Sequence, residues 1–437
     1  MSWPSPDHGI DPRPAAGADR PAPPAPPDQQ GAAPGPSFTP PSRQSQRGLD
    51  CFIFFLADVQ TGFGPFVAVY LTTQKWTQVE IGLVLSVGGI VGLLGQMPGG
   101  AIVDAARSER FVAGLAVALI ALSALGYAAW PLFPVVMASA TLHAAASCVL
   151  GPAIAAISLG LVGRAAIGER LGRNARYASL GNGVAAAVMG TCGYLVSSRS
   201  VFLVTCVLAV PTLLALSRIR GREIDAERAH GALPPAEAHG ATTKISSLLR
   251  QRPLLVFAAA MLLLQFANAA MLPLMAGVVT TRSSAAAPAL IAFCIIVPQA
   301  IVALASPSVG RFAQSFGRRP LLVAGFAALA VRGLLFAVVS DPYLLVAVQV
   351  FDGITAAVFA VLVPLIVADV AFGSGHFSFA QGIVGTAGGI GASFSTVAAG
   401  YVADQFGTGV AFVALAAVAA SGLAMVVLLM PETRRRD

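Results

Sequence analysis

Long apolar runs occupy most of the chain, and they decide what it can fold into. About twelve runs are long enough to cross the ~30 Å hydrocarbon layer of a bilayer, which requires roughly 20 apolar residues each. Of the 437 residues, 56% are hydrophobic and only 11% are charged, and the mean hydropathy is +0.77. A soluble domain could not carry this composition, so the sequence predicts an all-α polytopic membrane protein.

The apolar runs are divided by composition into two sets of six. The predicted transmembrane helices are 51–72, 80–103, 111–130, 135–160, 177–197, 201–217, 253–279, 285–306, 321–340, 342–370, 377–403 and 408–430. A Pro- and Ala-rich stretch precedes the first set, and a charged stretch broken by Gly and Pro-Pro separates the two sets. We therefore predict a disordered cytoplasmic tail (1–48), an N-terminal six-helix bundle (49–217), a cytoplasmic linker (218–252), a C-terminal six-helix bundle (253–430) and a cytoplasmic tail (431–437).

Lysine and arginine residues are distributed unevenly between the loops. With the N-terminus inside, most of the 27 fall in the inner segments, and only Lys75, Arg199 and Arg282 are placed outside. Basic residues stay on the cytoplasmic side, so both termini are predicted to be cytoplasmic. The net charge of +7 follows from this asymmetry and requires no nucleic-acid partner. The basic, amphipathic stretch 163–176 is expected to lie on the inner membrane face, and the linker residues His230 and His239 are expected to be solvated.

A short loop pattern occurs twice, about half the chain apart. The first copy is PGGAIVDAARSER (98–110) and the second is PSVGRFAQSFGRR (307–319). Each copy follows one apolar run and precedes another, as matching inner loops of two homologous halves would. The polar and glycine positions that the copies emphasise are Gly100, Asp104 and Arg110 in the first, and Gly310, Gln314, Gly317, Arg318 and Arg319 in the second.

These loops resemble the signature of the major facilitator superfamily, Gly-x-x-x-Asp-x-x-Gly-Arg-Arg, which lies between helices 2 and 3 and again between helices 8 and 9. The first copy has Arg107 in place of the second Gly, and the basic pair becomes Ser108 and Glu109; the second copy has Gln314 in place of the Asp. The resemblance covers the chain from about residue 50 to its end and implies twelve transmembrane helices in two pseudo-symmetric six-helix bundles. It also implies that Asp104 helps to hold helices together on the cytoplasmic side in one transport state.

Polar residues near mid-membrane recur at equivalent places in the two halves. An offset of 208 sets Gln60 over Asn268 and Pro65 over Pro273, and an offset of 209 sets His143 over Asp352. Such a repeat is expected of two related halves. The sequence therefore predicts a central cavity, and its candidate substrate and proton residues are Asp58, Gln60, His143, Gln265 and Asn268.

The charged residues inside the apolar runs require partners or a cavity. A carboxylate at the centre of a bilayer costs roughly 3 kcal/mol, so Asp58 is interpreted as a proton or substrate site, the alternative being half of a structural polar contact. His143 fits either a site or a hydrogen-bonded core residue. Arg332 is expected to pair with Asp352, with Gln349 one turn away, either as a fixed structural pair or as a charge that exchanges partners during transport.

Two classes of chemistry are disfavoured by the residues present. The five cysteines lie in apolar runs without CxxC spacing, so they are interpreted as structural thiols and no metal site is expected. The chain contains no Walker-type GxxxxGK[ST] stretch and only two lysines, so ATP is not expected to supply energy within this chain. No cofactor and no enzymatic activity are predicted.

The resemblance implies a transporter with one substrate site between the halves, alternately open to each side. Ionisable groups in the cavity favour proton coupling. We predict proton-coupled efflux (antiport) of small organic compounds, with Asp58 as proton carrier and His143 assisting. The alternative is symport or facilitated uptake of a small polar metabolite, and less favoured is a non-transporting sensor or scaffold. The protein is expected to be a monomer in the lipid bilayer of a bacterial cytoplasmic (inner) membrane.

Overall fold

The computed structural model describes residues 40–57, 59–60, 64–232, 245–282 and 287–434. Within these ranges all regular structure is helical. All of these residues belong to the unit Pro40–Asp437. The predicted all-α class is therefore confirmed for the described residues.

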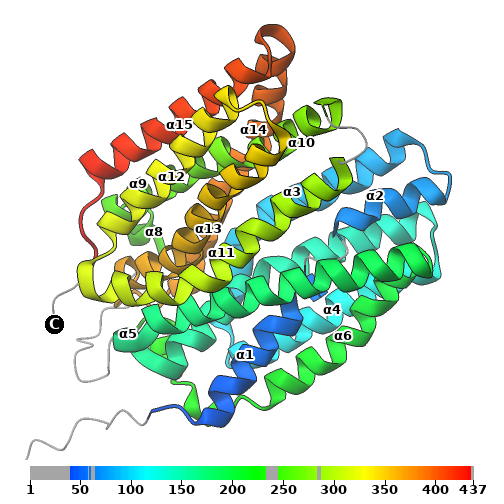
Figure 1. Cartoon of the computed structure of the whole chain (residues 1–437). Helices are drawn as coiled ribbons and strands as arrows, with labels where there is room; N and C mark the ends of the chain where they lie inside the picture. The colour runs from blue at the N-terminus through cyan, green and yellow to red at the C-terminus, as the bar shows by residue number, and fades with distance from the viewer. Residues whose placement is uncertain (1–39, 58, 61–63, 233–244, 283–286, 435–437) are drawn as a thin grey trace, which may run out of the picture. The chain divides into compact units, whose positions relative to one another are not determined.

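Fifteen α-helices are arranged along the described residues (Figure 1). The first half contains α1 (Arg43–Ala57), α2 (Gly64–Thr73), α3 (Gln78–Ala105), α4 (Glu109–Ala129), α5 (Phe133–Leu195) and α6 (Ser200–Ser217). The linker carries a 3₁₀ turn (Gly221–Glu223) and the short helices α7 (Ala226–Ala229) and α8 (Ile245–Leu248). The second half contains α9 (Arg252–Ala269), α10 (Met271–Arg282), α11 (Ala287–Phe316), α12 (Arg319–Val338), α13 (Pro342–Val370), α14 (Phe377–Phe406) and α15 (Thr408–Leu429).

Ten helical segments of the described chain are long and apolar enough to cross a membrane. One of them, Phe133–Gly193, has 61 residues, which at a rise of 1.5 Å corresponds to roughly three hydrocarbon thicknesses. Its backbone breaks at Gly163, where φ is 67° and ψ is 180°, so this segment provides two passes. Together α1 and α2 supply one more, and the predicted twelve passes are accounted for. Large apolar side chains such as Leu94, Val397 and Leu428 remain exposed, as a lipid-facing surface requires.

The first pass of the second half is interrupted, because α9 ends at Ala269 and α10 begins at Met271. Pro273 lies in the first turn after this interruption. Proline has no N–H to donate to the preceding turn, so a break at this point is its expected effect. In the first half, residues 58 and 61–63 between α1 and α2 lie outside the described residues.

The structure begins the first half earlier than the sequence predicted. The tail was expected to extend to residue 48, but α1 already begins at Arg43. The linker orders this extra turn: Ser42 donates through its N–H and its hydroxyl to the Glu223 carboxylate at 3.0 and 2.9 Å, and the Arg220 N–H donates to the Ser45 hydroxyl at 3.0 Å. Sequence periodicity does not report such long-range bonds.

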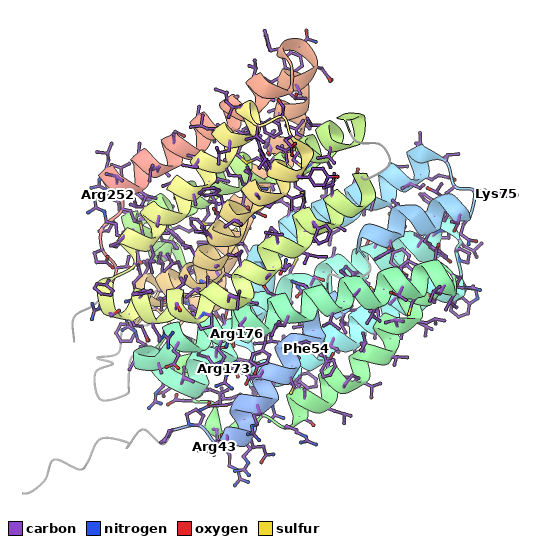
Figure 2. The ribbon with its side chains drawn as sticks, viewed as in Figure 1. Arg43, Phe54, Lys75, Arg173, Arg176 and Arg252 are labelled. Atoms are coloured by element: carbon purple, nitrogen blue, oxygen red, sulfur yellow. The ribbon has the colours of Figure 1, made fainter. Side chains whose placement is uncertain are left out.

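The stretch 163–176 also departs from expectation. Instead of lying flat on a membrane face, it continues as helix directly after Gly163. Arg170, only 4% exposed, donates to Asp50 of α1 at 2.5 Å, and Arg173 donates to the other oxygen of Asp50 at 2.5 Å. A buried carboxylate held by two guanidinium groups attaches the second part of α5 to α1. Figure 2 shows Arg173 on this part of α5, beside α1.

Candidate functional site

Arg332 on α12 forms a polar cluster within the second half. Its side chain is 1% exposed, and Nη1 donates to Oδ1 of Asp352 on α13 at 2.6 Å. The same nitrogen donates to Oδ1 of Asn268 on α9 at 2.6 Å. The structure thus joins the predicted ion pair to Asn268, which the sequence had assigned to the cavity. The two acceptors compensate the buried guanidinium in part, since its Nε has no hydrogen-bond partner among the described residues, and the contacts connect three helices.

Two other predicted residues lie close to these elements without joining the cluster. Gln349 on α13 is fully buried, but it makes no hydrogen bond to Arg332 or Asp352 within the described part of the chain. Gln265 on α9 is half-buried and lies over Gly388 of α14. The glycine leaves room for the stem of the glutamine side chain, so this position contributes to helix packing.

Gln60 and His143 meet in the first half. Gln60 follows the end of α1 in a π-helical turn, and its Nε2 donates to the carbonyl of Ser147 on α5 at 3.3 Å. His143, one turn earlier on α5, forms a hydrogen bond to the backbone of Gln60. Asp58 lies outside the described residues. In the first half, the amide of Gln60 thus meets the fourth pass, whereas in the second half Asn268 meets Arg332 on the third pass.

The two signature loops lie where the halves cross, and we call this part of the bundle the signature-loop end. At one crossing, α3 packs against α14. Both carboxylate oxygens of Asp104 accept hydrogen bonds from the start of α14, from the N–H groups of Ser378 at 2.9 Å and Phe379 at 2.7 Å. A carboxylate at this place satisfies N–H groups that the helix leaves free and matches the positive end of its dipole. A Cβ at Gly100 would overlap the carbonyl of Ser378, so glycine is needed for this close approach.

At the other crossing, α11 packs against the second part of α5. A Cβ at Gly310 would overlap the carbonyl of Gly168, and one at Gly172 would overlap the carbonyl of Ser306. Gln314 donates through Nε2 to the carbonyl of Ala165 at 2.6 Å. The equivalents Gly100 and Gly310 therefore do the same thing in both halves: they let a helix of one half touch the backbone of the other.

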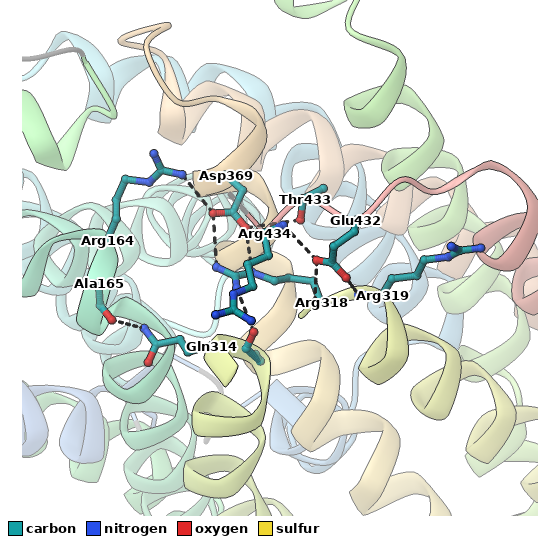
Figure 3. A network of polar contacts seen from close by, with 10 residues as sticks. Arg164, Ala165, Gln314, Arg318, Arg319, Asp369, Glu432, Thr433 and Arg434 are labelled. Carbon is teal, nitrogen blue, oxygen red and sulfur yellow. Dashed lines mark hydrogen bonds and ion pairs between the residues drawn. The ribbon is translucent and has the colours of Figure 1, made fainter. Parts of the chain in front are cut away.

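The basic residues of the second loop form an ordered network (Figure 3). Arg318 donates through Nε to Asp369, near the end of α13, at 2.9 Å, and Arg164 of the first half donates to the same carboxylate at 3.3 Å. Glu432 accepts from the backbone N–H groups of Arg318 at 2.8 Å and Arg319 at 3.0 Å. This network connects the loop, α13, the segment after α15 and the first half.

The remaining signature positions have local tasks. Gly317 adopts a φ of 101° that favours glycine, and a Cβ there would lie 2.5 Å from the Glu432 carboxylate. Arg319 donates to the carbonyl of Val427. Arg110 donates to the carbonyl of Ser217 at 3.4 Å, at the end of α6, rather than to a group at the crossing.

The environment of His230 differs most from the one that the sequence predicted. This histidine was expected to be solvated, but its Nε2 lies 3.1 Å from Oε1 of Glu109, and the side chains are 19% and 6% exposed. The close contact with the Glu109 carboxylate, together with the negative charges of Glu109 and Asp104, raises the pKa of His230, although burial acts against this. His239 lies outside the described residues. A signal did exist, because Glu109 stands where the signature has a basic residue and so requires a cation from elsewhere.

Comparisons with known proteins agree with this geometry. Residues 47–414 match the family described as the MFS_1 like family. An uncharacterized MFS-type transporter of Mycobacterium tuberculosis (strain CDC 1551 / Oshkosh) is 38% identical over 396 residues, which is 90% of this chain and 94% of the relative. A second such transporter, from strain ATCC 25618 / H37Rv, shows the same identity and coverage. These relatives favour a transporter over a sensor or scaffold.

Solved structures share the fold. The proton:xylose symporter XylE superposes with a TM-score of 0.70 at 15% identity, covering 90% of this chain and 96% of that one. The Escherichia coli fucose:proton symporter FucP gives 0.70 at 16% identity, with 88% and 98% covered. A human organic anion transporter gives 0.67 at 16% identity, with 88% and 100% covered. Together with the family match, they show that this chain is an integral membrane protein belonging to the MFS transporters.

Proposed function

We propose that this protein is a secondary transporter that works by alternating access and exports small organic compounds in exchange for protons. The observation that carries the proposal is the way the halves are joined at the signature-loop end. Asp104 binds the start of α14, Gln314 binds α5, and Arg164 binds Asp369. These bonds cross between the halves, so the halves are joined at this end of the bundle in this state.

The signature-loop end faces the cytoplasm in this proposal. Most lysine and arginine residues fall on that side when the N-terminus is placed inside, and basic residues stay cytoplasmic. The structure then represents a cytoplasm-closed state. The cytoplasm-open state forms when the helices separate at both crossings. One half then moves against the other about the substrate site. The mycobacterial relatives support a bacterial cytoplasmic membrane as the location.

Asp58 is the proposed proton carrier, with His143 assisting it. The contact between Gln60 and His143 supports this assignment, because it brings a titratable side chain to the first pass at Gln60, which follows Asp58 by two residues in the sequence. In the second half Arg332 is already held by two acceptors, so we assign it a mainly structural role, and Asn268 shares that role.

Transport can be tested with purified protein reconstituted in liposomes. The internal pH is followed while a panel of organic cations, organic anions and sugars is added. Wild type should move protons when a substrate is present, in the direction opposite to the substrate. Asp58→Asn should abolish this proton movement. Asp404→Asn, which changes an exposed carboxylate at the end of α14, is the matched control and should behave as wild type.

Two outcomes would overturn parts of the proposal. Proton and substrate movement in the same direction would establish symport, the alternative function. Substrate movement without proton movement, unchanged by Asp58→Asn, would make the protein a uniporter and remove any coupling role from Asp58.

A further inference from the structure

The linker between the halves makes ordered contacts with the signature-loop end. Its segment 225–231 packs on α5, where the Asp225 N–H donates to the carbonyl of Gly160 at 3.2 Å. The same segment reaches the turn that precedes α14: Phe377 N–H donates to the carbonyl of His230 at 3.2 Å, and Gly373 N–H donates to the carbonyl of Gly231 at 2.7 Å. The linker thus spans both halves at this point.

The His230 side chain points in the other direction, to the first half. It pairs with Glu109 at the start of α4, at 3.1 Å. One residue therefore binds the first half through its imidazole and the second half through its carbonyl. Opening of the α3–α14 crossing must separate these two attachments, because Asp104 and Glu109 belong to one half and Phe377 to the other. At least one of the His230 contacts has to break.

We propose that the linker is a strap across the cytoplasmic gate and that His230 is its proton-operated positioning residue. When it is protonated, the imidazolium compensates Glu109 and the strap holds the gate closed. When it loses the proton, the buried Glu109 carboxylate no longer has a cation, and the closed state becomes less favourable. This inference rests on the alternating-access function proposed above, and it adds a proton-binding position outside the membrane-embedded cavity.

The charged groups around His230 agree with this role. From α4 it faces Glu109, and from α3 it faces Asp104 and the backbone of Val103. On its own segment Arg228 is paired with Asp225 at 3.1 Å, and on α5 the charge within one turn of Gly160 is Arg164, which is bound to Asp369. The neighbourhood of the imidazole is therefore acidic, and the nearby arginines are engaged by other carboxylates.

The sign of the pH effect follows from these groups. Glu109 raises the pKa of His230 in the closed state. The closed state therefore binds the proton of His230 more tightly than the open state does. The stabilisation is complete below the ordinary histidine pKa of about 6.5 and is lost as pH rises through the raised value. Rising cytoplasmic pH should therefore release the gate, and each unit of pKa difference changes the open-to-closed ratio by about tenfold.

The test measures the gate directly and needs no substrate. Spin labels at Glu169 on α5 and Arg311 on α11, both exposed and both on the crossing that His230 does not touch, report the distance between the halves. The native cysteines are replaced by serine, and the protein is studied in nanodiscs from about pH 5.5 to about pH 8.5. We expect the wild type to shift towards longer distances as pH rises.

Three variants separate the proton switch from a merely structural role. His230→Gln should show the long-distance population at every pH, and His230→Lys, which keeps a cation, should stay closed throughout. Glu109→Gln should flatten the pH dependence, because it removes both the carboxylate that the imidazolium compensates and the group that contributes most to the raised histidine pKa. His376→Gln, which removes the titratable residue that precedes α14, is the control and should keep the wild-type transition.

A His230→Gln variant that titrates like wild type would overturn the proposal, as would a His230→Lys variant that opens with rising pH. A thermal melt of each variant confirms that it is folded. Because the distances are measured without substrate, a titrating gate in a protein that moves no compound would contradict the proposed transport function alone. Transport with a gate that ignores His230 would contradict the strap alone.

Discussion

The two signature loops have the same backbone task but nearly opposite charges. In the first loop Asp104 caps α14 and Glu109 needs a cation, which His230 supplies. In the second loop Gln314 replaces the capping carboxylate, and the cation Arg318 needs an acid, which Asp369 supplies. In both loops, therefore, a charged residue stands at the start of the helix that follows the loop, and a residue of opposite charge from elsewhere in the chain compensates it. The sign of the charge can differ between the loops. The glycines, by contrast, cannot be exchanged, because they set how closely the halves approach.

The largest effect is expected where backbone meets backbone. Gly100→Val should keep α3 and α14 apart, since even a Cβ would overlap the Ser378 carbonyl. We expect the closed state at the signature-loop end to be lost and transport to fall by more than about tenfold. Gly92→Val is the matched control on the same helix, because a Cβ there meets no heavy atom within 4 Å. Equal transport by the two variants would contradict the role assigned to this crossing, and the Glu169–Arg311 label distance provides the structural measurement.

An intermediate effect is expected from the charge of the second loop. Arg318 is 8% exposed and is bound to Asp369, whereas its neighbour Arg319 is exposed. Arg318→Gln should lower the free energy of unfolding by about 3 kcal/mol, because it leaves a buried carboxylate with a weaker partner. Arg319→Gln should cost less than about 1 kcal/mol. Chemical denaturation in detergent measures both, and similar losses for the two variants would show that the Asp369 network is not the source of stability.

The smallest effect is expected in how the contributions of the two loops to stability depend on pH. Burial acts to raise the pKa of Glu432, but the backbone N–H groups of Arg318, Arg434 and Arg319 outweigh it and hold the pKa below its ordinary value. Its contribution is therefore present above the ordinary glutamate pKa and lost as pH falls through the lowered one. The His230 contribution has the opposite sign and is lost on the alkaline side.

This difference can be measured with Glu432→Gln. Its unfolding midpoint should lie below that of wild type at neutral pH and should converge with it in acid. A gap between the two proteins that persists below about pH 3 would show that Glu432 acts through packing rather than through its charge. The Glu109→Gln variant supplies the comparison for the first loop. Its unfolding midpoint should differ most from that of wild type at acidic pH, and the difference should shrink as pH rises.

The parts of the site that the sequence predicted are those governed by local periodicity. Arg332 and Asp352 lie on adjacent antiparallel passes, so counting residues from the membrane surface was enough to bring them together. Gln60 and His143 were assigned to one cavity from the repeat, and the structure places them in contact. No comparable pattern leads from His230 to Glu109 or from Asp50 to Arg170, because those pairs join segments far apart in the chain through packing that composition does not encode.

By itself, the sequence determined that this protein crosses a membrane repeatedly, that its halves are related and that its charges are asymmetric. The reason is that bilayer thickness imposes a length on every apolar run, and the cost of burying charge restricts where each residue can stand. Only the tertiary structure decided which helices of the two halves touch, that they are joined at the signature-loop end, and that the linker supplies the cation for Glu109. Those features depend on backbone contacts at a few glycines and on partners more than 100 residues apart, such as Glu109 and His230, which no local pattern specifies.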